Sequence, residues 1–116
     1  MKGLHTRIDR AGADANVAVV RLSGHIDTQT VAGLNETFKQ LLKEPCHRIV
    51  IDLAEVTYIS SAGWGVFIGE IRNIRDQRGD LKLVALAPEV EEVYRVLEFD
   101  SILKAYPSVE EALRDF

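Results

Sequence analysis

The sequence predicts a single α/β domain with a mixed central β-sheet, about four helices and an N-terminal β-hairpin. A chain of 116 residues, 47% hydrophobic and 28% charged, is long enough for one modest core and has the composition of a folded protein. Strand-like and helix-like hydrophobic patterns alternate after an initial pair of strand-like segments, which favours this class. No repeat, low-complexity segment or linker divides the chain, so we expect one domain over residues 1–116.

The first two strand-like segments are expected to pair as the hairpin. Residues 4–10 predict a short edge strand that ends at a turn over residues 11–14. Residues 17–22 (VAVVRL) are a β-branched run and predict a second strand. The turn that follows, over residues 23–28, ends in side chains that can cap a helix.

A first helix and a central strand come next. The helix is expected over residues 29–43, and Pro45 follows soon after its end. Residues 48–53 are apolar almost throughout, which suits a central strand covered on much of both faces. The apolar positions that mark one face of the helix are Val31, Leu34, Phe38, Leu41 and Leu42.

A second helix is expected from Ser61 to about Arg78, with Gly79 as its terminator. Residues 81–87 (LKLVALA) predict another buried strand. The apolar stripe of this helix consists of Trp64, Phe67, Ile68, Ile71 and Ile74.

The C-terminal part predicts two more helices around a short strand. Pro88 suits the first turn of a helix over residues 89–98. Residues 102–106 predict a short strand, and Ser108 with Glu111 forms a capping box at the start of the last helix. The buried face of helix 89–98 is expected to carry Val90, Val93 and Leu97.

Composition excludes several classes of function. The net charge of −4 and the scattered Lys and Arg residues argue against nucleic-acid binding, which needs clustered cations. No apolar run resembles a signal peptide or approaches the roughly 20 residues of a membrane span, so we expect a cytoplasmic protein without membrane contact. Cys46 is the only cysteine and is expected to be a thiol in a loop or at the edge of the core.

The sequence does not indicate an enzyme. His5, His25 and His47 lie in separate segments without ligand spacing, so we expect no metal site. Ser61, His25 and Asp27 could be combined into a triad on paper, but any chain of this size with three histidines allows that. No phosphate-binding loop is present, and we expect no cofactor.

Ser60 and Ser61 are the candidate functional side chains, because they stand where a strand gives way to a helix. A hydroxyl there can cap the helix, and a phosphate there would meet free N–H groups and the positive end of the helix dipole. Trp64 has two interpretations, a core residue or a partly exposed contact for a partner. Asp52, near the end of its strand, is expected to cap the following loop.

The same stretch resembles the signature of STAS domains, and most of all the stand-alone bacterial anti-sigma factor antagonists. The pattern is D-L-x-x-V-x-x-I-x-S-x-G-x-G, formed here by Asp52, Leu53, Val56, Ile59, Ser61, Gly63 and Gly65. The segments 22–27, 81–88, 93–99 and 108–113 are also similar to family segments in the same order. The resemblance therefore covers nearly the whole chain.

The resemblance implies a non-enzymatic switch. In its unphosphorylated form such a protein binds an anti-sigma factor with serine kinase activity and releases the sigma factor. Phosphorylation of a serine at the start of the helix ends the binding, and the matching residue here is Ser61. Ser60 is an alternative acceptor, because it replaces the aspartate that usually precedes that serine. The expected partner surface comprises Ser60, Ser61, Gly63 and Trp64 with His25, Asp27 and Thr28.

Two other functions stay open. One is a STAS scaffold or subunit of a larger signalling or transport assembly that is never phosphorylated. The other is a small-molecule or nucleotide sensor, for which the sequence offers neither a phosphate loop nor a basic pocket.

Overall fold

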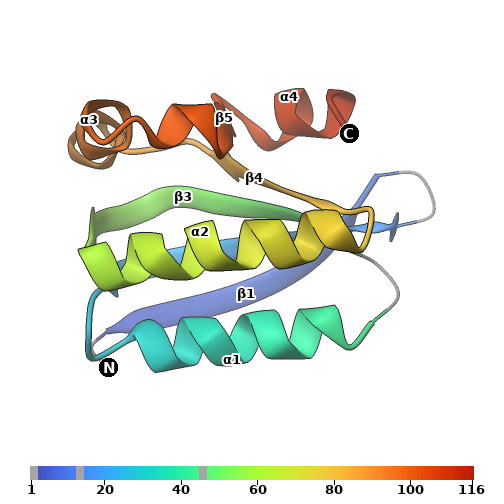
Figure 1. The fold of residues 1–116 in the computed structure, drawn as a ribbon, viewed down its shortest axis with the longest axis horizontal. Coiled ribbons are helices and arrows are strands. Elements are labelled where there is room, and N and C mark those ends of the chain that lie inside the picture. Colours follow the sequence, from blue (N-terminus) through green and yellow to red (C-terminus); the bar gives the residue numbers. More distant parts are fainter. Residues whose placement is uncertain (1–2, 13–14, 45–46) are drawn as a thin grey trace.

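A five-stranded mixed sheet forms the centre of the protein, with strand order β1-β2-β3-β4-β5 (Figure 1). The computed structural model describes residues 3–12, 15–44 and 47–116, so Pro45 and Cys46 lie outside the described residues. Strand β1 pairs antiparallel with β2, and the other neighbours are parallel. This architecture confirms the predicted α/β class, the mixed sheet and the N-terminal hairpin.

The elements follow the predicted order. The strands are β1 (Leu4–Ala11), β2 (Val17–Ile26), β3 (Arg48–Ile59), β4 (Asp80–Val84) and β5 (Lys104–Tyr106). The helices are α1 (Val31–Leu42), α2 (Ser61–Asp76), α3 (Pro88–Val96) and α4 (Val109–Arg114), with a short 3-10 helix η2 (Phe99–Ser101) between α3 and β5.

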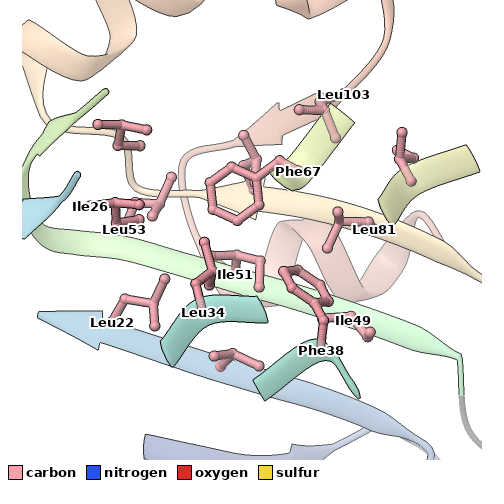
Figure 2. Close-up of a cluster of buried hydrophobic side chains, with 14 of the residues drawn as sticks. Leu22, Ile26, Leu34, Phe38, Ile49, Ile51, Leu53, Phe67, Leu81 and Leu103 are labelled. Atoms are coloured by element: carbon pink, nitrogen blue, oxygen red, sulfur yellow. The ribbon is translucent and has the colours of Figure 1, made fainter. Parts of the chain in front are cut away.

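The core is divided by the sheet into a large and a small cluster. On one face, α1 and α2 pack through Leu34, Phe38 and Phe67 against alternate residues of the strands, as Figure 2 shows. On the other face, α4 packs through Ala112 against the intervening residues, such as Val19. Because side chains alternate along a strand, this division puts α4 on the face opposite to α1 and α2.

Strands β2 and β3 are longer than the predicted strands 17–22 and 48–53. They remain paired through polar residues up to Ile26 and Ile59, with shifts in register on the way. Gly24 has a φ of +120°, and a Cβ atom there would lie 2.0 Å from the carbonyl oxygen of Gly3. Only glycine fits this close approach, which lets β2 continue past the polar segment. In contrast, β4 stops before the predicted residue 87, because Ala85 adopts a positive φ of 59°.

A buried lysine lies beneath α4. Lys82 is 2% exposed, and its ammonium group lies 3.2 Å from a carboxylate oxygen of Asp80 and 4.9 Å from the ring centre of Phe116. Burial alone would raise the pKa of Asp80, but the backbone N–H of Leu81, the Lys82 ammonium and the Arg75 guanidinium together hold it below its usual value. The pair therefore neutralises a charge that would be costly to leave alone.

We expect the two members of this pair to respond differently to substitution. Asp80→Ala leaves the Lys82 charge buried without its carboxylate and should lower the free energy of unfolding by about 3 kcal/mol. Lys82→Met removes the buried charge at similar volume and should change stability by less than about 1 kcal/mol. Urea unfolding followed by the fluorescence of Trp64, the single tryptophan, measures both. Equal losses for the two variants would contradict this account.

The lowered pKa of Asp80 also predicts how the stability of the fold changes at acidic pH. Because the pKa of Asp80 is lowered from 3.8 in the folded protein, its stabilisation is complete above that value and is lost as pH falls through the lower folded-state pKa. The wild type should therefore lose stability more steeply below pH 4 than Asp80→Asn does.

Two glycines near the start of α2 should also respond in opposite ways to substitution by alanine. A Cβ atom on Gly63 would lie 2.5 Å from Cγ2 of Ile26 and 2.9 Å from Cγ2 of Ile59, whereas one on Gly65 meets nothing within 4 Å. We expect Gly63→Ala to destabilise the fold by about 1–2 kcal/mol through overpacking. Gly65→Ala should stabilise it by about 0.5–1 kcal/mol through helix propensity. Urea unfolding tests the pair, and a stabilised Gly63→Ala variant would contradict the close packing.

Candidate functional site

Ser60 connects β3 to α2 and acts as the helix cap. Its backbone is extended, with a φ of −76° and a ψ of 171°, and its Oγ accepts a hydrogen bond from the N–H of Gly63 at 3.3 Å. Its own N–H donates to the carbonyl oxygen of Ile26 at 2.7 Å. Ser60 is therefore half-buried and held from both sides, and the predicted capping role is confirmed for this serine.

Ser61 occupies a different environment, although it is the next residue. It is the first residue of α2, its side chain is exposed, and its hydroxyl has no hydrogen-bond partner within the described part of the chain. The first turn of α2 contains no acidic residue. A negative group added to Ser61 would thus meet the positive end of the helix dipole without a neighbouring carboxylate on that turn.

The β2–α1 loop lies beside these serines, because Ile26 and Ile59 are paired at the ends of parallel strands. Asp27 is half-buried and caps the loop, since its Oδ1 accepts from the N–H of Gln29 at 2.9 Å and of Thr30 at 3.1 Å. His25 and Thr28 are exposed. Ligands of open α/β sheets commonly bind at this carboxyl edge of the strands. The structure therefore brings the two serines and the predicted loop residues to one edge.

Gly63 and Trp64 do not belong to the accessible surface. Trp64 is 2% exposed, and its ring lies 6.1 Å from Tyr94 and 4.9 Å from Phe99, measured between ring centres. Of its two interpretations, the core residue is confirmed and the exposed contact is wrong. The physical reason is the one-residue connection at Ser60, which seats the first turn of α2 directly on the strand ends.

An exposed apolar patch on α3, formed by Val93, Val96 and Leu97, lies near this edge. Val96 is 70% exposed and Leu97 55% exposed. The sequence predicted that Val93 and Leu97 face the core, but the buried residues of α3 are Val90 and Tyr94. The sequence signal that could have indicated this was the number of apolar residues in α3, which exceeds what one face of a helix can bury. Tyr94 stacks on Trp64, so α3 runs beside the start of α2.

The prediction that Asp52 caps a following loop is wrong, because β3 continues past it to Ile59. The Oδ1 atom of Asp52 accepts from the N–H of Ala54 at 3.0 Å, and its Oδ2 lies 2.5 Å from a guanidinium nitrogen of Arg21. Arg21 also pairs with Asp9 on β1 and, with Arg7, lowers the pKa of Asp9. These contacts bind neighbouring strands together on the face that carries α4.

The histidines do not converge on a catalytic or metal-binding centre. His5 lies in β1, His25 near the end of β2 and His47 just before β3. The described residues contain no group of three His, Cys, Asp or Glu side chains able to hold a metal ion. None of the described helices combines the length and apolar character that crossing a bilayer requires.

Comparison with known proteins agrees with this architecture. The STAS domain family matches residues 10–112. The chain is 32% identical over 95 residues to BtrV of Bordetella bronchiseptica, a candidate anti-sigma factor antagonist, with 82% of each protein covered. Other relatives are anti-sigma-B and anti-sigma F factor antagonists. Antagonists of this family are regulatory binding proteins and not enzymes. This agrees with the prediction that the chain is not an enzyme.

Solved structures show the same fold. An anti-sigma factor antagonist from Mycobacterium paratuberculosis has a TM-score of 0.86 at 23% identity, over 97% of this chain and 93% of that chain. SpoIIAA of Bacillus is known in unphosphorylated and phosphorylated forms. The unphosphorylated form has a TM-score of 0.78 at 18% identity, with coverage of 96% and 95%. From the matched family and the shared fold, we conclude that the chain belongs to the STAS domain family.

Proposed function

We propose that this protein, acting as one STAS domain over residues 1–116 in the cytoplasm, is an anti-sigma factor antagonist switched by phosphorylation. Its unphosphorylated form binds an anti-sigma factor with serine kinase activity and releases the sigma factor. Phosphorylation of Ser61 ends that binding. The observation that carries the proposal is the exposed hydroxyl of Ser61, which has no hydrogen-bond partner among the described residues and stands at a helix N-terminus whose first turn lacks acidic residues.

The geometry favours Ser61 over Ser60 as the acceptor. The Ser60 hydroxyl already accepts the N–H of Gly63, and the residue is half-buried between β3 and α2. A phosphoryl group on Ser60 would have to displace that cap. Ser61 can take the group outward, where the helix end favours its negative charge.

The switch follows from charge. Phosphorylation adds about −1.5 to −2 charges at pH 7. The helix N-terminus stabilises those charges inside this protein, but a docked partner whose site holds nucleotide phosphates would be repelled by them. Binding can therefore be lost without refolding of the domain.

Phosphorylation itself is the first test of this proposal. Incubation with an anti-sigma factor kinase and ATP should add one phosphate to the wild type and to Ser60→Ala, but none to Ser61→Ala. Intact mass measures this. Ser60→Ala should also lose roughly 1 kcal/mol of stability with its cap, whereas Ser61→Ala should not. A phosphate that persists on Ser61→Ala would contradict the assignment, and none with any kinase would favour a STAS scaffold that is never phosphorylated.

The apolar patch of Val93, Val96 and Leu97 should supply affinity for the same partner. Exposed apolar side chains on a helix that packs against the start of α2 are suited to anchor a protein interface. We expect Val96→Ser to weaken binding about tenfold, as measured by calorimetry. Ile8→Ser is the matched control, because Ile8 is 41% exposed but lies on β1 at the opposite edge of the sheet. Equal effects of the two substitutions would refute a role for the patch.

A further inference from the structure

The outer edge of β5 opens into a groove that the proposed switch does not use. A cavity of about 720 Å³ follows this edge. It is lined by the β5 residues and Pro107, by Ala85 and Leu86 after β4, by side chains of α3 and η2, and by Asp115 just after α4. Figure 1 shows β5 at the margin of the fold, between α3 and α4. Because α3 and α4 belong to opposite faces of the sheet, the groove runs along the strand edge between them.

The backbone of β5 offers a partly unpaired edge to this groove. Ala85 donates its N–H to the carbonyl oxygen of Tyr106 at 3.0 Å, so Tyr106 bonds toward β4. Peptide groups alternate along a strand, and this places the N–H and C=O of the preceding residue, Ala105, on the open side. Such groups are a template for another extended segment.

The chain leaves β4 abruptly at the head of the groove. Ala85, which lines the groove, has a φ of 59°, a strained value for a residue with a Cβ atom. Backbone strain of this kind often accompanies binding sites. Here the strained residue ends β4 and stands in the lining of the groove.

The charges in the groove are predominantly negative. Its lining has three carboxylates, those of Glu91, Asp100 and Asp115, and two cations, Arg95 and Lys104. Both cations are already engaged, Arg95 with Glu91 at 2.7 Å and Lys104 with Asp115 at 3.8 Å. Within the described chain, Asp100 takes part in no ion pair. A ligand with a positive charge is therefore complementary to this lining.

We propose that the groove binds an extended peptide segment with basic side chains, which adds a sixth strand to the sheet at β5. The peptide backbone pairs with Ala105, and a Lys or Arg side chain of the peptide reaches Asp100. Strand addition of this kind takes affinity from main-chain hydrogen bonds and specificity from alternate side chains. This surface is distinct from Ser61, so its test does not depend on the proposed switch.

The test titrates the full chain with the peptide acetyl-Val-Lys-Val-Lys-Val-amide and follows backbone amide signals by NMR. Binding should shift the Ala105 amide and slow its hydrogen exchange, and added salt should weaken the effect. Asp100→Asn should weaken binding roughly two- to fivefold. Glu92→Gln is the matched control, because Glu92 is exposed on α3 and does not line the groove.

Three outcomes would overturn the proposal. The first is equal binding of a peptide with Glu in place of Lys, which would remove the charge argument. The second is equal binding of a peptide with N-methylated backbone, which cannot pair as a strand. The third is protection of the Ala105 amide without peptide together with a concentration-dependent dimer, which would assign the edge to a second copy of the chain.

Discussion

The close seating of α2 on the ends of β2 and β3 is the constraint on which the rest of the site depends. It rests on a one-residue connection at Ser60, whose N–H donates to Ile26, and on Gly63, which has no room for a Cβ atom beside Ile26. With the helix fixed in this way, Trp64 turns into the core and Ser61 turns to the surface. The contrast between Trp64 and Ser61 therefore follows from how the first turn of α2 is fixed on the strand ends.

This arrangement divides two tasks between adjacent hydroxyls. Ser60 satisfies a backbone donor at the helix start, and Ser61 presents its hydroxyl at the surface, as the proposed phosphorylation requires. A residue that caps a helix is a poor acceptor for a bulky anion, because the cap would be lost. A separate capping residue lets a modification act on binding while the helix keeps its end. Trp64 adds a rigid link to α3 through its stacking on Tyr94, so the apolar patch keeps its position relative to Ser61.

The two faces of the sheet are stabilised in different ways. The face under α1 and α2 is an extended apolar core, whereas the face under the short α4 also contains the buried Lys82 with Asp80 and an ion-pair network around Arg21. A short helix covers little area, so polar pairing fills part of this face. The groove along β5 is bordered by side chains of α3 on one side and by Asp115, just after α4, on the other.

The sequence by itself determined the α/β class, the element order, the cap at the start of α2 and the chemistry of the Ser60–Ser61 segment, because these depend on local periodicity and on residues adjacent in the chain. The tertiary structure decided which residues of that segment reach the surface. Trp64 and Val93 are both apolar residues in amphipathic helices, yet one is buried and the other exposed, since each outcome depends on which element packs against it. The continuation of β3 to Ile59 likewise depends on pairing with β2, a contact between segments distant in the chain that local pattern does not encode.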